Sequence, residues 1–303
     1  MTMPLDRLAA LAGRSWRVAP LPGGLTNTNV RVTTDDGVEP ALDLVVRCSH
    51  AGADLLGIDR AAERDNTAAA ASAGVGAPVV DYRPDLGMLV IGYLHATALT
   101  DGSFADEAVM ARAAAAVRRL HAGPRFTGDF DMFARRAAYL STISDRGLRL
   151  PADYTAYADA WEDVRRALAV SPPPTVPCNN DLLAANFLDD GERVWLIDYE
   201  YSGNNDPSFE LGNTVAECGF TPEQRDAWVE AYVGSPTAAD LARVRLQALC
   251  SCYGWSLWGF IQAALSPIEF DFWDWGMERF EKAQALFGAA DFPTLLAEAA
   301  AGG

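Results

Sequence analysis

The chain has almost no lysine. Among its 303 residues Lys282 is the only one, and every other basic side chain is an arginine. A phosphate loop of the G-x-x-x-x-G-K-[ST] type needs a lysine near the start of a nucleotide-binding unit, where this chain has none. Schiff-base chemistry would also have to use Lys282. The sequence therefore excludes a lysine-dependent phosphate loop near the N-terminus.

Zinc-binding and disulfide patterns are missing too. The five cysteines form no C-x-x-C pair and the three histidines are scattered, which argues against a zinc site. An odd number of cysteines without regular spacing favours reduced thiols, as in a cytoplasmic protein. These residues are Cys48, Cys178, Cys218, Cys250, Cys252, His50, His95 and His121.

Positive charge and long apolar runs are scarce. The formal net charge is −17, whereas nucleic-acid binders are usually basic, so no nucleic-acid partner is expected. An acidic surface would suit a cationic substrate, although solubility alone also explains it. No apolar run reaches the roughly 20 residues of a membrane-spanning helix. Residues 1–13 predict a short amphipathic helix without a signal-peptide core, so we expect a cytoplasmic protein without membrane insertion.

The sequence changes character near Gly92. Before it, short β-prone segments are separated by turn signals and interrupted by one alanine-rich helix. After it, the apolar spacing is mainly helical. We therefore predict an α+β protein with a small β-rich N-terminal lobe, residues 1–92, and a larger, mostly helical C-terminal lobe, residues 93–303. The predicted strands are Trp16–Leu21, Asn29–Thr34, Asp43–Cys48, Val79–Arg83 and Gly87–Gly92, and the predicted helices are Asp59–Ala73, Asp106–His121, Tyr154–Ala169, Pro222–Val233, Ala238–Leu265 and Asp271–Phe287.

A dense polar cluster lies in a predicted strand–loop–strand segment, residues 176–197. One tight loop could aim Asp181 and Asn186 at a single point, and Asp198 follows the second strand. These residue types suit phosphoryl transfer, in which one Asp orients the attacking hydroxyl and accepts its proton, while an Asn and a second Asp hold Mg²⁺ against the phosphates. The alternative is that they cap strand ends, where Asn and Asp are common.

The motif formed by Asn180, Asp181 and Asn186, followed by Ile-Asp-Tyr-Glu-Tyr at 197–201, resembles that of the choline/ethanolamine kinase family. This family belongs to the wider superfamily of aminoglycoside-phosphotransferase-like and protein-kinase-like enzymes. Asn180 favours the choline kinase branch, because aminoglycoside kinases carry Gly at that place. The resemblance implies a two-lobed protein-kinase-like fold and the use of ATP and Mg²⁺.

The resemblance also implies roles for individual residues. Asp181 would be the catalytic base, Asn186 and Asp198 would be Mg²⁺ ligands, and Glu200 would contact a second metal ion or the substrate. The chain departs from the family in one place, because Asn179 stands where the family has His. An Asn amide supplies a similar hydrogen-bond donor, so we expect activity to persist.

The N-terminal part fits the same family. A Gly-Gly-Leu-Thr-Asn turn resembles its nucleotide loop, although most such turns are ordinary hairpins. An arginine at a strand end takes the place of the kinase lysine, with an acidic partner on the following helix; the alternative is a surface ion pair of about 0–1 kcal/mol. The chain between Val90 and Leu94 would form a hinge beside the adenine. The nucleotide-binding residues implied are Gly23, Gly24, Thr26, Asn27, Arg47, Glu63, Gly92, Tyr93 and Leu94.

Aromatic side chains recur at helical spacing in the C-terminal third. Trp255 and Trp258 share one helix face, and Phe272, Trp275 and Arg279 share a face of the next helix. Such stripes are usually packing core. The resemblance implies instead a pocket for a trimethylammonium group, to which each aromatic face contributes about 0.5–2 kcal/mol. The implied substrate residues are Tyr201, Glu217, Trp255, Trp258 and Trp275, with Phe272 as support.

These observations predict an ATP-dependent kinase that transfers the γ-phosphate to the hydroxyl of choline or a related amino alcohol. Three alternatives stay open. The substrate could be ethanolamine, an aminosugar or an aminoglycoside. The chain could be a catalytically silent pseudokinase that binds a quaternary amine. It could also be an interaction protein whose aromatic helices bury a partner. His121 is expected to support a helix end, without a catalytic role.

Overall fold

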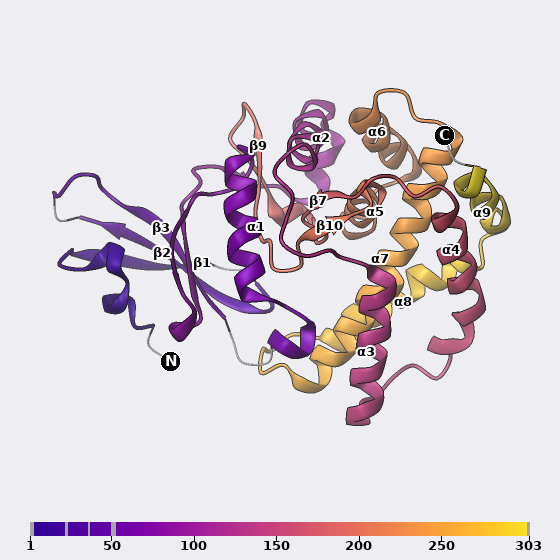
Figure 1. The fold of residues 1–303 in the computed structure, drawn as a ribbon, viewed down its shortest axis with the longest axis horizontal. Helices are drawn as coiled ribbons and strands as arrows, with labels where there is room; N and C mark the ends of the chain where they lie inside the picture. Colours follow the sequence, from indigo (N-terminus) through magenta and orange to yellow (C-terminus); the bar gives the residue numbers. More distant parts are fainter. Residues whose placement is uncertain (1–2, 22–23, 36, 50–52, 302–303) are drawn as a thin grey trace.

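The structure is a computed structural model that describes residues 3–21, 24–35, 37–49 and 53–301. A β-rich part lies at the N-terminal end of the molecule, and a larger helical part carries the C-terminus (Figure 1). The predicted α+β class is confirmed. The last strand of the N-terminal sheet in chain order ends at Gly92, and the lobe boundary at residues 92 and 93 stays a prediction.

Five antiparallel strands form the N-terminal sheet, in the order β1-β2-β3-β5-β4. Along β3, burial alternates from residue to residue, so Val46 and Cys48 enter the core and Arg47 points from the opposite face. All five strands were predicted, with β2 beginning two residues earlier than expected, at Asn27. The strands are β1 Trp16–Leu21, β2 Asn27–Thr34, β3 Asp43–Ser49, β4 Val79–Arg83 and β5 Met88–Gly92.

The N-terminal segment differs from the amphipathic helix predicted for residues 1–13. It forms two 3₁₀ turns, η1 Leu5–Arg7 and η2 Ala9–Leu11, because Leu8 between them is extended at φ −80° and ψ 125°. An extended residue interrupts the hydrogen-bond ladder that a continuous helix needs. The apolar side chains still reach the sheet, since Leu8 and Leu11 are buried in its core.

One helix, α1 Arg60–Ser72, crosses beside this sheet (Figure 1). The Asp59 carboxylate caps it by accepting hydrogen bonds from the backbone N–H groups of Ala61 and Ala62. Its buried side chains include the polar residues Glu63 and Asn66. Both have partners, as buried polar groups require: Glu63 pairs with Arg47 of the sheet, and Asn66 bonds to Thr127 and Ser202 of the helical part.

The helical part is built around α7, which has 28 residues and is buried along most of its length. A helix that is apolar all round belongs in a core, and α7 packs against α3, α5, α8 and α9. Gly212 of α5 faces α7, where an added Cβ would lie only 2.5 Å from the backbone nitrogen of Ala248. The helices are α2 Glu107–His121, α3 Met132–Arg146, α4 Ala158–Val170, α5 Pro207–Glu217, α6 Pro222–Val233, α7 Ala238–Leu265, α8 Phe272–Phe287 and α9 Phe292–Ala301.

Three of these helices, α3, α5 and α9, were not predicted from the sequence. In α5, Gly212 and Asn213 have low helix propensity, and only tertiary packing overrides it. Its start does carry a signal, because Asp206 caps the first turn and Pro207 occupies its first position. The predicted helix beginning at Tyr154 starts instead as a 3₁₀ turn, and α4 begins at Ala158.

Two small sheets in the helical part hold the loops of interest. β7 pairs with β10, and β6, β8 and β9 form the other sheet. Asn179 directly follows β7, and Asp198 comes two residues after the end of β9. These strands are β6 Thr97–Ala98, β7 Val176–Cys178, β8 Phe187–Asp189, β9 Val194–Leu196 and β10 Gly203–Asn205. The remaining 3₁₀ turns are η3 Ala53–Leu56, η4 Pro84–Leu86, η5 Asp101–Ala105, η6 Tyr154–Tyr157 and η7 Ala184–Asn186.

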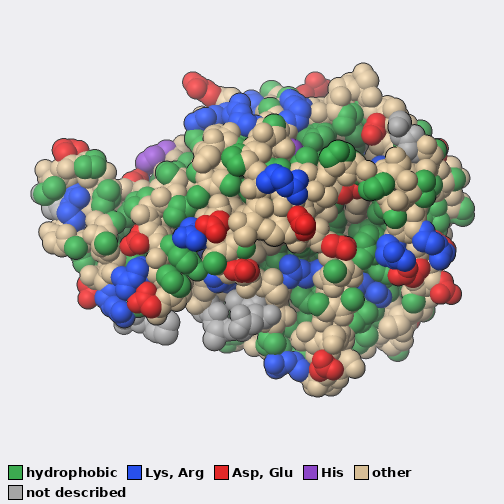
Figure 2. Space-filling view, in the orientation of Figure 1, with side chains coloured by type: hydrophobic (Ala, Val, Ile, Leu, Met, Phe, Trp, Pro, Cys, Tyr) green, Lys and Arg blue, Asp and Glu red, His purple; other side chains and the backbone are tan. Residues whose placement is uncertain are grey.

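Charges of both signs are mixed on the face of the molecule shown in Figure 2. Several pair locally, such as Arg165 with Glu162 at 2.7 Å and Arg83 with Asp85 at 2.8 Å. Exposed pairs of this kind contribute little to stability. In the described ranges, no helix has both the length and the apolar character needed to cross a membrane.

Candidate active site

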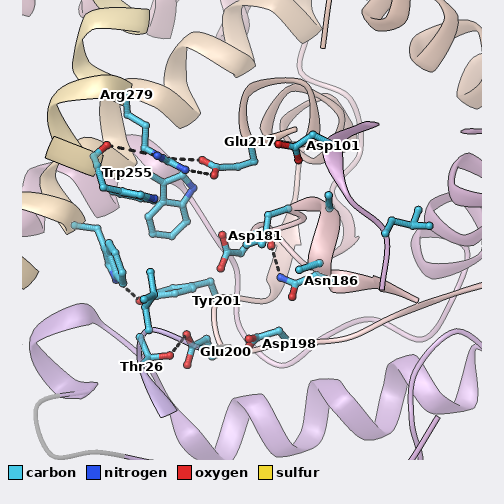
Figure 3. Close-up of a pocket in the computed structure, with 18 of the residues that line it drawn as sticks. Thr26, Asp101, Asp181, Asn186, Asp198, Glu200, Tyr201, Glu217, Trp255 and Arg279 are labelled. Atoms are coloured by element: carbon cyan, nitrogen blue, oxygen red, sulfur yellow. Dashed lines mark hydrogen bonds and ion pairs between the residues drawn. The ribbon is translucent and has the colours of Figure 1, made fainter. Parts of the chain in front are cut away.

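A cavity of about 490 Å³ lies where the turn after β1, the loops after β7 and β9, and the helices α5, α7 and α8 meet (Figure 3). It combines acidic and amide side chains with three indole rings. The predicted site residues that line it are Gly24, Thr26, Asp181, Asn186, Asp198, Glu200, Tyr201, Glu217, Trp255, Trp258 and Trp275.

Asp181 lies in the loop after β7 and faces this cavity (Figure 3). Its backbone is fixed, because its carbonyl accepts hydrogen bonds from Asn186 Nδ2 at 2.8 Å and from the Leu183 N–H at 3.1 Å. Removal from water, followed by the negative charges of Glu217, Asp198 and Glu200, raises the pKa of Asp181 well above its usual range. The carboxylate is therefore held where it has a stronger tendency to take up a proton.

Asn186 and Asp198 line the same cavity from two different loops. The amide nitrogen of Asn186 is bound to the carbonyl of Asp181, which leaves Oδ1 as its atom for a cation. The Ile197 N–H donates to the Asn186 carbonyl at 3.1 Å and ties the two loops together. Asp198 has a left-handed backbone, with φ 66°. The site thus offers one amide and one carboxylate oxygen, the hard ligands that Mg²⁺ prefers.

No cluster of three or more His, Cys, Asp or Glu side chains is arranged to hold a metal ion among the residues that the structure describes. Mg²⁺ in kinase-type sites is usually bound by one or two protein groups, with substrate phosphates and water completing the shell. Asn186 and Asp198 fit this kind of shared site.

Arg47 connects the sheet to these loops. Its guanidinium contacts Glu63 at 3.1 Å, Asp198 at 2.7 Å and Glu200 at 2.9 Å. Burial disfavours its charge, but the three carboxylates outweigh burial and raise the pKa of Arg47 above its usual value. Since the Glu63 side chain is 3% exposed, this is not the surface ion pair that the sequence left open.

Glu200 accepts hydrogen bonds from four side chains. Thr26 Oγ1 lies at 2.7 Å and Asn27 Nδ2 at 3.0 Å, while Arg47 and Arg60 donate at 2.9 and 3.1 Å. Burial opposes ionisation, but the two arginines lower the pKa of Glu200 below its ordinary value. The geometry thus joins the predicted nucleotide loop to the segment after β9, and metal contact by Glu200 stays a prediction.

The predicted nucleotide-binding residues are only partly brought together. Gly24 has a left-handed φ of 93°, which suits glycine, whereas Gly23 lies outside the described residues. The hinge residues Gly92, Tyr93 and Leu94 do not line the main cavity. The backbone N–H of Gly92 donates to the carbonyl of Pro78, and that of Tyr93 donates to the carbonyl of Asp43, each at 2.9 Å. A narrow cavity lies between this strand and the metal-ligand candidates, lined by Arg47, Leu89, Ile91, Leu196 and Asp198 among others.

An aromatic box closes the other end of the main cavity; we use this name for Tyr201, Trp255, Trp258 and Trp275. Tyr201 and Trp255 pack edge to face at 4.8 Å, and Trp258 and Trp275 lie 5.0 Å apart. Trp258 donates its indole N–H to the Tyr201 hydroxyl at 2.8 Å. Phe272 is buried behind the box, 5.6 Å from Trp258, and supports it without lining the cavity.

Glu217 reaches the cavity from the end of α5, but it is not a free carboxylate. Arg279 donates to both of its oxygens, through Nε at 3.1 Å and through Nη2. The same guanidinium lies over the Trp275 ring, 3.3 Å from its centre. From the sequence, Arg279 was expected one turn after Trp275 on the same helix, but it was not predicted as a site residue. Helical spacing does not reveal a partner on another helix.

Glu210 is a second residue that the sequence did not single out. Its buried carboxylate accepts the backbone N–H groups of Asn179 at 2.8 Å and Asn180 at 2.6 Å. Burial raises the pKa of Glu210 to about 7, although these two hydrogen bonds oppose the shift. His121 lies beside it and bonds to the hydroxyl of Tyr232 at 2.7 Å, in keeping with a structural role.

Comparison with known proteins shows to which family the chain belongs. The model of the phosphotransferase enzyme family matches residues 17–246. A choline/ethanolamine kinase family protein from Mesorhizobium loti has a similar structure, with 34% identity, a TM-score of 0.85, and 98% of this chain and 97% of that chain covered. Choline kinase LicA from Streptococcus pneumoniae is 23% identical, with a TM-score of 0.74 over 89% of this chain and 93% of its own.

Human choline/ethanolamine kinase is 26% identical over 315 residues, which cover 88% of this chain and 78% of the human protein. The names of these relatives agree with the resemblance on which the sequence prediction rested, and the structural similarity to the Mesorhizobium loti protein confirms the predicted fold. The chain belongs to the phosphotransferase enzyme family and, within it, to the choline/ethanolamine kinases, which phosphorylate alcohol groups of small molecules.

Proposed function

We propose that this chain is an ATP-dependent kinase that transfers the γ-phosphate to the hydroxyl of choline. One observation carries the proposal: a single cavity has Asp181, Asn186 and Asp198 at one end and the aromatic box at the other. A small amino alcohol that placed its cationic group among the rings would bring its hydroxyl toward Asp181. This arrangement favours phosphoryl transfer over the alternative of an interaction protein, because a surface that only buries a partner does not need Asp181, Asn186 and Asp198 in the same cavity.

Asp181 would orient the substrate hydroxyl and accept its proton as the oxygen attacks phosphorus. Its raised pKa favours proton uptake, and general-base catalysis of this kind contributes about 10²–10⁴ in rate. Arg47 would face the nucleotide phosphates with a permanent charge, held in place by Glu63. Together these groups supply orientation and electrostatic stabilisation, which dominate catalysis of phosphoryl transfer.

ATP and Mg²⁺ are part of the proposal. An AMP complex is known for a LicA protein of similar fold, which supports an adenine nucleotide here. Asn186 and Asp198 would hold Mg²⁺, which neutralises charge on the phosphates when bound. Asp198 accepts a hydrogen bond from Arg47 at 2.7 Å. The guanidinium proposed to bind phosphate and the carboxylate proposed to bind Mg²⁺ are therefore adjacent, and the phosphates would have to lie beside both.

The polar groups of the aromatic box favour a quaternary amine over a primary one. Trp255 donates its indole N–H to Asn213 at 3.1 Å, and Trp258 donates to Tyr201. Arg279 donates hydrogen bonds to both carboxylate oxygens of Glu217, which are therefore already paired. A primary ammonium carries three N–H donors that need acceptors, whereas a trimethylammonium group needs only aromatic faces and negative potential. The box therefore suits choline better than ethanolamine.

The test is ADP release by the purified protein with Mg-ATP and a series of acceptors. We expect kcat/KM to rise from ethanolamine through its N-methylated derivatives to choline, with aminosugars inactive. A preference for ethanolamine or for an aminosugar would contradict the choline assignment. Absence of turnover with every acceptor, combined with a choline-induced rise in melting temperature, would instead show a silent amine-binding protein.

A further inference from the structure

We propose that Arg60 is a positioning residue for the nucleotide, because it keeps Glu63 and Glu200 paired and so leaves Arg47 available to the phosphates; this inference rests on the proposed phosphoryl transfer. Arg60 is the first residue of α1 and was not predicted as a site residue. Its Nη1 donates to Glu63 Oε2 at 2.7 Å and to Glu200 Oε2 at 3.1 Å. Arg60 does not line the main cavity, so it would act through these carboxylates and not by contact with the amino alcohol.

Arg60 completes a closed ring of four charged side chains, which we call the charge ring: Arg47, Glu63, Arg60 and Glu200. Arg47 contacts Glu63 at 3.1 Å and Glu200 at 2.9 Å, so each glutamate pairs with both arginines. The side chains of the two glutamates are only 3% and 4% exposed. A buried carboxylate that loses its counter-charge is strongly destabilising. Both glutamates therefore need a cation at every stage of the reaction.

Arg47 has more anionic partners than one guanidinium can pair with equally well. Besides the two glutamates it contacts Asp198 at 2.7 Å, and in the proposed reaction it would also face the phosphates. Any shift of Arg47 toward the phosphates weakens its contacts with Glu63 and Glu200. Because Arg60 contacts both glutamates, neither is left unpaired by such a shift. Arg47 can then bind phosphate at a lower cost in free energy.

Helix stability does not explain an arginine at this position. The first turn of a helix carries a partial positive charge, so a cation there is electrostatically unfavourable. The two glutamates hold the guanidinium instead, and its side chain is 20% exposed. Its Nε and Nη2 are buried and have no hydrogen-bond partner within the described ranges of the chain. Arg60 therefore has donors left with which to follow either carboxylate.

Glu200 connects Arg60 to the predicted nucleotide turn. The same carboxylate accepts hydrogen bonds from Thr26 at 2.7 Å and from Asn27 at 3.0 Å, and the bond to Thr26 is drawn in Figure 3. Both residues belong to the segment that was predicted to bind the nucleotide. A change at Arg60 should therefore affect the binding of ATP, whereas the aromatic box keeps its own contacts with the amino alcohol.

The test measures the Kd of Mg-ATP by calorimetry for wild type, Arg60→Gln and Arg60→Lys. Arg60→Gln removes the charge but keeps a hydrogen-bond donor, so Arg47 must neutralise both glutamates alone. We expect Kd and the KM for ATP to rise about tenfold, a coupling typical of residues in one ion-pair network. KM for choline should stay within about threefold of wild type. Arg60 makes both bonds through Nη1, so Arg60→Lys, with its single ammonium, should return Kd to within about threefold of wild type.

Two further variants separate this role from general damage to the fold. In Glu200→Gln one of the two glutamates no longer needs a counter-charge, so the addition of Arg60→Gln should raise Kd by less than about threefold. Arg64→Gln is the matched control, because Arg64 lies one turn further along α1 and pairs with Asp65 at 2.6 Å near the surface. This control should leave Kd unchanged.

The outcomes distinguish the inference from the proposed function. Equal Kd values for wild type and Arg60→Gln, a loss that Arg60→Lys does not recover, or the same loss with and without Glu200→Gln would each overturn the role of Arg60. A wild type that binds Mg-ATP but turns over no acceptor would instead count against the proposed function. The comparison of Kd values would still decide the role of Arg60, because it does not require turnover.

Discussion

Glu217 receives two hydrogen bonds from Arg279, and Arg279 in turn covers one face of Trp275. The carboxylate therefore neutralises a fixed positive charge at the edge of the aromatic box. In Glu217→Gln that charge stays uncompensated, and it would repel a cationic substrate. We expect KM for choline to rise about tenfold or more, which corresponds to about 1.4 kcal/mol, with kcat less affected. Steady-state kinetics checks this, and Glu281→Gln, exposed on the same helix as Arg279, is the control.

Replacement of Asp181 tests the proposed base. Asp181→Ala should lower kcat by about 10²–10⁴, because the hydroxyl would lose both its orienting group and its proton acceptor. ATP binding, followed by thermal shift, should be nearly unchanged, since Arg47 and the turn around Thr26 are retained. Turnover near the wild-type rate would show that another group accepts the proton.

The indole of Trp258 tests the aromatic box. Trp258→Leu removes one face, and loss of a desolvated cation–π contact of about 2 kcal/mol predicts a rise of about 30-fold in KM for choline. The melting temperature should fall as well, because the side chain is buried. Trp161→Leu provides the comparison, since Trp161 is equally buried in the same core but does not line the cavity. Similar KM values for the two variants would contradict a substrate role for Trp258.

His121 gives the protein a predictable dependence of stability on pH. Burial lowers the pKa of His121 to about 3, whereas an unfolded histidine has a pKa near 6.5. The unfolded state thus binds more protons, so the stabilising contribution is complete above about pH 6.5 and is lost as the pH falls toward 3. When the pH falls from 7.5 to 5, the free energy of unfolding of the wild type should decrease by about 2 kcal/mol more than that of His121→Gln. Urea denaturation at several pH values measures this, and parallel curves would contradict it.

Features that local chemistry dictates could be predicted from the sequence. The five strands of the N-terminal sheet follow from alternating β-prone segments and turn residues. The spacing of Asp181, Asn186 and Asp198 indicated a shared site, and the three side chains line one cavity. Trp255 and Trp258 share a face because residues three apart on a helix always do.

Features that depend on distant partners could not be predicted. Nothing near Arg279 in the chain reveals that Glu217, on another helix, binds it. Glu210 binds the loop that carries Asp181 from α5, a helix that was not predicted because Gly212 and Asn213 have low helix propensity. The expected N-terminal helix is interrupted at the extended residue Leu8, which is buried with Leu5 and Leu11 in the core of the sheet. In each case tertiary packing, which no local pattern encodes, decided the outcome.

Under the proposed function, the helix α5 bears on the length of the substrate. Glu210 near its start accepts hydrogen bonds from the loop that carries Asp181, and Glu217 at its end lines the cavity beside the aromatic box. They lie seven positions apart on the helix, or about 10 Å along its axis at 1.5 Å per residue. Gly212, between them, lies in close contact with the backbone of α7, so this segment of α5 packs directly against a buried helix. If the protein acts on choline as proposed, we expect an amino alcohol with a longer carbon chain between nitrogen and oxygen to overshoot Asp181, and α5 would then set the spacer length.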